Sequence, residues 1–203
     1  MTIRKRTAAG APERLNDLEV LRQAGWACVN LEAAVADTQV QAVWIAPDCI
    51  GSIRAWVGLS LEQHPVPETG GFLLGRMSGQ APFSVSLEVF VPSRSIDYSS
   101  PNRLSFGAGA LMELDTARRE HPALVPVGWF HTHPGHTPYL SSYDLAIHEG
   151  FFIEPWQLAV VLDPLTPGQD TGVFSRKADG SVNNKPDWPA WISWTALLTS
   201  DAA

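Results

Sequence analysis

The segment Gln157–Leu162 (QLAVVL), apolar from its second residue onward, constrains the fold of this chain more than any other feature. A strand with no polar face must be buried on both sides, so other elements have to cover both faces of its sheet. The chain has 203 residues, which is enough to build one such core and leaves little for a second full domain. Hydrophobic residues make up 45% of it and charged residues 17%, which indicates a globular protein and excludes a disordered or fibrous one.

Hydrophobic periodicity predicts further strands and helices around that segment. The predicted strands are Val40–Ala46, Gly71–Met77, Phe83–Val91, Val125–His133, Gln157–Leu162 and Asp170–Ser175. The predicted helices are Pro47–Gln63, Gly109–Glu120 and Ser142–Glu149. The side chains expected to face inward from the second of these helices are Leu111, Met112, Leu114 and Ala117. This mixture predicts an α/β or α+β sandwich, in which a mixed, curved sheet is flanked by helices.

The two ends of the chain carry weaker patterns. Residues 1–38 are predicted to be an N-terminal extension, in which leucines at three-residue spacing favour a short helix within Glu13–Gln23. Residues 39–203 are predicted to form the domain itself. Its tail, Asp187–Leu198, has three tryptophans at three-residue spacing, which favours a helix packed on the core.

Composition and charge limit the cellular compartment and the kinds of partner that we expect for this protein. No apolar segment follows the basic start of the chain, and no apolar run approaches about 18 residues, so we expect a cytoplasmic protein without a membrane partner. The formal net charge of -7 lacks the basic footprint of a nucleic-acid-binding protein. Cys28 and Cys49 have no spacing typical of a disulfide framework or a cysteine zinc site, and we expect two buried thiols. The oligomeric state is not specified by the sequence.

The densest chemical pattern lies between Gly128 and Asp144. His131 and His133 are two apart on a predicted strand, so their side chains point to the same face. Ser141 and Asp144 are three apart at the start of a predicted helix and share a face of it. If that helix folds back over the strand end, the two histidines and the aspartate form a metal site with a fourth position for water, as catalytic zinc sites are built.

Glu68 directly precedes the predicted strand Gly71–Met77 and is the candidate general base of such a site. The alternative interpretation is that Glu68 is an exposed turn residue, that the histidines are surface residues and that Ser141 and Asp144 only cap a helix. The joint occurrence of the spacings favours the metal site.

These residues resemble the active-site signature of the JAMM (MPN-plus) family of zinc metallopeptidases, of the prokaryotic type. The chain has a Glu before Gly-x-Leu-Leu-Gly, then His-x-His-Pro, then Ser-x-x-Asp, and the resemblance extends over roughly Val40–Ser175. It implies the MPN fold, a sandwich similar to that of cytidine deaminases, and a single catalytic Zn²⁺. A deaminase itself is disfavoured because no His-x-Glu with Pro-Cys-x-x-Cys occurs.

The resemblance also implies a role for each residue of the signature. His131, His133 and Asp144 resemble the zinc ligands. Glu68 resembles the general base, and Ser141 resembles the residue that hydrogen-bonds the water and the oxyanion. All five residues are present, which argues against an inactive scaffold.

By the same resemblance, the reaction is hydrolysis of the amide or isopeptide bond after the C-terminal tail of a ubiquitin-like protein, as in deubiquitinases. We expect a bacterial ubiquitin-like conjugation pathway, with antiphage defence as one setting. The alternatives are a zinc hydrolase of sulfur-carrier proteins or small peptides, and a non-catalytic MPN scaffold.

Several further residues are candidates for supporting roles. Arg94, Arg103 and Phe106 could line a groove for the substrate tail, or they could be ordinary loop residues. His136 is expected to be a solvent-exposed loop residue, the alternatives being that it lines the substrate channel or binds a second ion. His148, one helical turn after Asp144, either orients a ligand or is partly exposed. Ser142 is expected to be the helix cap.

Overall fold

The computed structural model describes residues 21, 24–166, 170–184 and 191–192. Its strands are β1 (Ala27–Asn30), β2 (Val40–Ile45), β3 (Gly70–Gly75), β4 (Met77–Ser78), β5 (Phe83–Leu87), β6 (Val89–Pro92), β7 (Ile96–Ser100), β8 (Arg103–Phe106), β9 (Val125–Thr132), β10 (Leu158–Leu162), β11 (Thr171–Phe174) and β12 (Trp191–Ile192). Its helices are α2 (Pro47–Leu61), α3 (Ala108–Glu120) and α4 (Ser142–Phe151).

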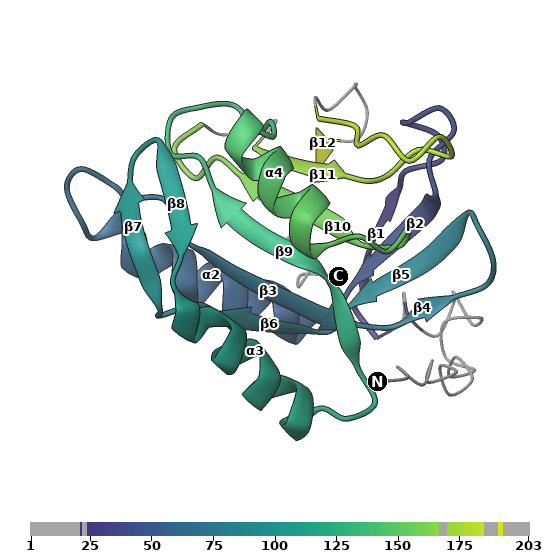
Figure 1. Cartoon of the computed structure of the whole chain (residues 1–203), viewed down its shortest axis with the longest axis horizontal. Helices are drawn as coiled ribbons and strands as arrows, with labels where there is room; N and C mark the ends of the chain where they lie inside the picture. The colour runs from purple at the N-terminus through teal and green to yellow at the C-terminus, as the bar shows by residue number, and fades with distance from the viewer. Residues whose placement is uncertain (1–20, 22–23, 167–169, 185–190, 193–203) are drawn as a thin grey trace, which may run out of the picture.

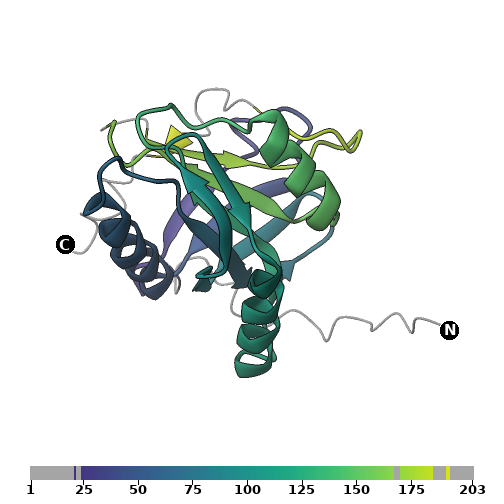
Figure 2. The same ribbon diagram turned by 60° about the vertical axis from the view of Figure 1, so that its left-hand side comes forward.

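The strands form three sheets (Figure 1). A six-stranded sheet has the order β12-β11-β10-β9-β3-β6, a four-stranded sheet has the order β1-β2-β5-β4, and β7 and β8 form a hairpin. β9 and β10 pair in parallel, whereas β3 pairs antiparallel with both β9 and β6, so the large sheet is mixed. Figure 2 shows α2 and α4 on opposite sides of this arrangement. The predicted α+β sandwich is confirmed.

β10 shows why both faces of the large sheet must be covered. Leu158, Val160 and Leu162 belong to one hydrophobic cluster, which α2 and the four-stranded sheet complete. The alternating residues Ala159 and Val161 belong to a second cluster, which is completed by side chains from α3 and α4. The apolar run Gln157–Leu162 therefore supplies both cores at once, as a strand buried on both faces does.

Three predicted elements differ in the structure. The predicted strand Gly71–Met77 ends at Gly75 as β3, and Met77 belongs to β4 of the four-stranded sheet. The predicted strand Phe83–Val91 is two strands, because the pairing of β5 with β2 ends before Glu88. The N–H of Glu88 donates to the carbonyl of Leu74, and its carboxylate pairs with Arg76. β5 then joins the four-stranded sheet, and β6 joins the large one. In the tail, Trp191–Ile192 is the strand β12, paired with β11, and not part of a helix. The rest of the predicted tail helix lies outside the described residues, as does Glu13–Gln23 except for Leu21.

The inward face predicted for α3 is confirmed at Leu114 and Ala117, which belong to or pack on the core, and is wrong at Leu111 and Met112. Leu111 and Met112 are 54% and 73% exposed, whereas Ala110 and Ala117 are buried and Leu114 is half-buried. The helix meets the sheet through small residues, and the larger apolar side chains next to them point outward. Of the two cysteines, Cys49 is buried as expected, but Cys28 is exposed because it points to the face of β1 opposite that of the buried Val29.

The division of the chain at residue 38 stays a prediction. Within the predicted extension, β1 pairs antiparallel with β2, and Leu31 and Val35 are buried in the core. No helix among the described residues is long and apolar enough to span a membrane.

Candidate metal centre

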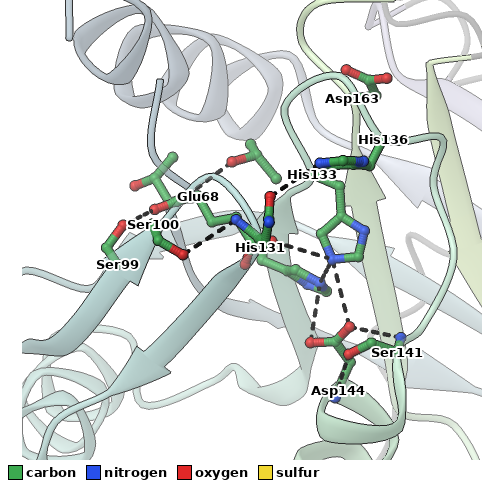
Figure 3. Close-up of polar contacts among 12 residues, drawn as sticks. Glu68, Ser99, Ser100, His131, His133, His136, Ser141, Asp144 and Asp163 are labelled. Atoms are coloured by element: carbon green, nitrogen blue, oxygen red, sulfur yellow. Dashed lines mark hydrogen bonds and ion pairs between the residues drawn. The ribbon is translucent and has the colours of Figure 1, made fainter. Parts of the chain in front are cut away.

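The centre lies where β9, the segment before β3 and the start of α4 meet (Figure 3). His131 is the last residue but one of β9, and His133 follows the strand, held by a bond from its N–H to the carbonyl of Leu162. Their Nε2 atoms lie 3.0 Å apart. Each Nε2 also lies 3.5 Å from an oxygen of the Asp144 carboxylate. The three side chains are buried, and their donor atoms all lie within 4.8 Å of one another.

α4 fixes the carboxylate of Asp144 through its own N-terminus. Ser141 is the N-cap: its Oγ accepts a hydrogen bond from the N–H of Asp144, at 3.2 Å, and its own N–H donates to Asp144 Oδ2, at 2.8 Å. This reciprocal capping box satisfies two of the free N–H groups of the helix and holds Asp144 in place. The expectation that Ser142 caps the helix is wrong, because Ser142 is its first residue and is exposed.

Glu68 approaches the same centre from the start of β3. Its side chain is 4% exposed, and Oε1 lies 3.8 Å from His133 Nε2. Its backbone is held on both sides, since its N–H donates to the carbonyl of Ser100 and its carbonyl accepts from the hydroxyl of Ser99. The interpretation of Glu68 as an exposed turn residue is therefore wrong.

The register of β3 against β9 brings the two motifs together. Gly70 pairs with His131 across the sheet. One residue earlier, the Thr69 N–H donates to Thr132 Oγ1 and its carbonyl accepts from the Thr132 N–H, both at 2.9 Å. The buried hydroxyl of Thr132, between the two histidines, thus ties Glu68 to them. The sequence pattern did not identify this role.

The pKa values of the two carboxyl groups at the centre are shifted in opposite directions. Burial acts to raise the pKa of Asp144, but its contacts with His131 and His133 and its bond with Ser141 outweigh burial and hold that pKa well below the usual range. Burial, and next the charge of Asp144, raise the pKa of Glu68 to about 8. Burial lowers the pKa of His131, so its imidazole is neutral. One anionic carboxylate, one neutral imidazole and one carboxyl ready to exchange a proton share the site.

The donor set fits a divalent cation. Two imidazole nitrogens facing each other at 3.0 Å can share at most one proton between them, whereas a cation satisfies both lone pairs and the Asp144 oxygens together. Two histidines and one carboxylate are the ligands of catalytic zinc sites. His131, His133 and Asp144 would hold the ion, with Glu68 beside it.

The remaining candidate residues lie around this centre. Arg94 lines a cleft of about 580 Å³ that also includes Glu68 and residues of β7. Arg103 is exposed, and its guanidinium lies 4.6 Å from the centre of the Tyr143 ring. Phe106 is half-buried and stacks on Phe72, with ring centres 5.2 Å apart, so it packs against the core.

The two further histidines have different surroundings. His136 is exposed, as expected, and its Nε2 lies 3.1 Å from Asn102 Oδ1. His148 is 0% exposed, which rules out the partly exposed alternative. The buried Asp163, which the sequence analysis missed, accepts from the N–H of Gly135 and so holds the loop after His133. Its place directly after the apolar strand β10 is the signal that could have identified it.

The fold and the site together define a mixed α+β sandwich with a buried two-histidine, one-aspartate centre for a metal ion. The family model described as "JAB1/Mov34/MPN/PAD-1 ubiquitin protease" matches residues 38–152. The chain belongs to this family, and the resemblance to the JAMM metallopeptidases is confirmed.

Individual relatives cover shorter parts. The "AMSH-like protease" of Homo sapiens and that of Mus musculus are each 34% identical to this chain over 110 residues, which is 53% of this chain and 22% of the relative. "STAM-binding protein-like" of Xenopus laevis is 34% identical over 108 residues, 53% of this chain and 24% of the relative. The chain thus matches about a quarter or less of these curated relatives.

A solved structure supports the fold. The solution structure of protein DSY2949 from Desulfitobacterium hafniense superimposes with a TM-score of 0.50 and 21% sequence identity. The match covers 70% of this chain and 88% of that one.

Proposed function

We propose that this protein is a zinc-dependent isopeptidase, which hydrolyses the amide bond after the C-terminal tail of a ubiquitin-like protein. The observation that carries the proposal is the buried Glu68 carboxyl, 3.8 Å from His133 Nε2, facing a complete two-histidine, one-aspartate ligand set. The family match and the names of the AMSH-like relatives support the same reaction class.

Each residue has a defined task in this reaction. When held by His131, His133 and Asp144, zinc would act as a Lewis acid and would lower the pKa of a water molecule from about 15.7 to about 7. Glu68 takes a proton from the attacking water and delivers it to the leaving amine. Positive charge at the centre favours the ionised form that Glu68 needs as a base. Ser141 accepts one hydrogen bond as a cap, which leaves its O–H to donate to the oxyanion.

The Glu68→Ala variant tests the proposal. We expect the cleavage rate of a ubiquitin-like fusion to fall by at least about 10²-fold, because general acid–base catalysis contributes about 10²–10⁴-fold. Zinc content, measured on the same sample, should stay unchanged, since Glu68 is not a ligand. Glu149→Ala, at an exposed position of α4, is the matched control and should keep both properties.

Other outcomes separate the alternatives. Full cleavage by Glu68→Ala would contradict its role as base. Wild-type protein that cleaves short peptides but no ubiquitin-like fusion would indicate a peptide hydrolase. Protein purified without zinc, and unable to bind it, would indicate a scaffold.

The substrate tail is proposed to extend along β7. Among the described strands β7 pairs only with β8, its Ser100 carbonyl also accepts from the Glu68 N–H, and the strand lines the cleft that contains Glu68. An extended peptide can add to such an edge through backbone hydrogen bonds. Arg94 lines the same cleft, and Arg103 extends from the partner strand β8. Phe106 would support the hairpin from beneath.

Charge reversal tests the docking role of these arginines. We expect Arg94→Glu or Arg103→Glu to raise KM for a tailed substrate about three- to tenfold, or about 0.7–1.4 kcal/mol, and to spare a short peptide. Equal effects on both substrates would reject the docking role. Arg118→Glu, at an exposed position near the end of α3, is the control.

The proposed setting is the cytoplasm and a bacterial ubiquitin-like conjugation pathway, with antiphage defence as one such setting. The β7–β8 hairpin is short, which favours weak preference among linkages. Neighbouring genes for a ubiquitin-like protein with activating and conjugating enzymes would support this setting.

A further inference from the structure

His148 lies outside the ligand set but close to it. It follows Asp144 by one turn of α4, and its side chain is 0% exposed. Its Nδ1 accepts a hydrogen bond from the indole Nε1–H of Trp129, at 3.2 Å. A buried imidazole on the helix that carries a metal ligand therefore holds a buried indole on the strand that carries the other ligands.

Trp129 in turn contacts the ligand His131. The two are alternate residues of β9, so they share a face of the sheet. Their rings are stacked, with centroids 4.4 Å apart and planes 7° from parallel. Phe152 stacks on Trp129 as well, at 6.0 Å and 10°. The two faces of the indole pack against these rings. The hydrogen bond to His148 fixes the position of the indole within its own plane.

The polar contacts of His131 among the described residues are all made by Nε2, which faces His133 and Asp144. A metal-binding histidine usually donates its second ring nitrogen to a carboxylate, carbonyl or water, which orients the ring. In the part of the chain that the structure describes, the buried Nδ1 of His131 has no hydrogen-bond partner. The stacked indole therefore takes the place of that hydrogen bond.

We propose that His148 is a positioning residue of the metal centre: it anchors the Trp129 indole, and the indole sets the plane of the His131 imidazole so that its Nε2 faces His133 and Asp144. The inference rests on the metal site of the proposed function, but not on the identity of the substrate.

The protonation of His148 agrees with this role. Nδ1 can accept the indole N–H only when it carries no proton, so the hydrogen of the neutral ring is on Nε2. Burial, and next the charge of Arg176, lower the pKa of His148 to about 4. Its buried Nε2 has no hydrogen-bond partner among the described residues, which is unfavourable for a polar group. A leucine would avoid that penalty but could not accept the indole N–H.

Cobalt binding to four variants tests the proposal. His148→Leu removes the acceptor, Trp129→Phe removes the donor but keeps a ring, and His148→Gln keeps an acceptor. We expect the Kd for Co²⁺, measured by chelator competition, to rise about tenfold or more in the first two, as for other residues that orient metal ligands. The visible absorption bands of bound Co²⁺ should change with it. The Kd of His148→Gln should stay within about threefold of that of wild type. The Kd of the double variant, which combines His148→Leu with Trp129→Phe, should be no higher than that of either single variant.

Controls separate positioning from loss of stability. Val173→Ala truncates a buried side chain of β11 in the opposite core cluster, so it lowers stability and should leave the Kd and the spectrum unchanged. If His148→Leu does not fold, Trp129→Phe tests the same bond from the donor side. Unchanged Co²⁺ affinity in these variants, or a His148→Gln variant as weak as His148→Leu, would overturn the role of His148. A wild-type protein that binds no Co²⁺ would instead overturn the metal site.

Discussion

At the residue scale, Asp144 and Ser141 combine structure and chemistry. Their capping box begins α4 and also holds the carboxylate that faces the two histidines. The sequence predicted the shared face of the two residues, because a Ser-x-x-Asp spacing is local. It predicted the wrong cap, because two adjacent serines offer the same chemistry and only the backbone conformation of Ser141, extended at φ -64° and ψ 168°, distinguishes them.

The two serines therefore make a matched pair of substitutions. Ser141→Ala should lower the free energy of unfolding of the metal-free protein by about 1 kcal/mol, the usual effect of losing a helix cap. Ser142→Ala, at an exposed helix position, should change it by less than about 0.5 kcal/mol. Urea unfolding monitored by circular dichroism measures both. Equal effects of the two variants would show that the cap contributes no stability of its own.

At the same scale, the sequence identified those residues whose arrangement depends only on a short spacing along the chain. His131 and His133 are two apart on a strand, so their convergence could be predicted from the strand alone. His148 could be named as a candidate for orienting a ligand, but its bond with Trp129 could not be recognised, because that contact joins β9 to α4 and depends on how the helix packs. The position of Glu68 likewise depends on the register of β3 with β9.

At the element scale, β3 lies between two neighbours and is closely packed at its ends. A Cβ added at Gly75 would overlap the backbone carbonyl of Ser86 and approach Val127 Cγ2 at 3.2 Å. The predicted strand Gly71–Met77 located β3 but continued into β4, and it did not reveal this packing constraint. In the same way, alternation through Glu88 concealed the break between β5 and β6, because each strand keeps its own buried face while the pairing partner changes.

Alanine at two glycines tests the packing of β3. Gly75→Ala should lower the free energy of unfolding by about 1–3 kcal/mol or more, since an added methyl group in a filled space forces neighbours to move. Gly51→Ala is the control: it lies on an exposed position of α2 with nothing within 4 Å of the added Cβ, and should stabilise by about 0.5–1 kcal/mol. A Gly75→Ala variant as stable as wild type would show that β3 has room to shift.

At the scale of the whole molecule, the large sheet separates two cores, and the metal centre lies at one end of the strands that divide them. The apolar run of β10 predicted this two-sided burial. The partition into a six-stranded and a four-stranded sheet could not be predicted, because strand pairing joins residues far apart in sequence and the alternation of side chains is the same in either sheet. The stability of the assembled protein should depend on pH through the groups that this packing buries.

The lowered pKa of His148 determines one direction in which stability changes with pH. Its pKa is about 4 in the folded protein and about 6.5 when unfolded, so between these values the unfolded chain binds more protons. Stability from neutral His148 is thus fully present above pH 6.5 and is lost as the pH falls towards 4, by about 3 kcal/mol in total. The lowered pKa of His131 acts in the same direction. The raised pKa of Glu68 acts oppositely: its contribution is present below pH 4.5 and is lost as the pH rises through 8.

Because these contributions partly cancel, the difference between wild type and His148→Gln isolates His148. In metal-free protein, the free energy of unfolding of wild type should fall relative to that of His148→Gln by about 3 kcal/mol between pH 7 and pH 4, measured by urea titration at each pH. Ser142→Ala, which changes an exposed residue that does not titrate, should run parallel to wild type. Parallel curves for wild type and His148→Gln would mean that His148 titrates alike in the folded and unfolded chains, and that its buried, neutral state does not contribute to the acid sensitivity of the fold.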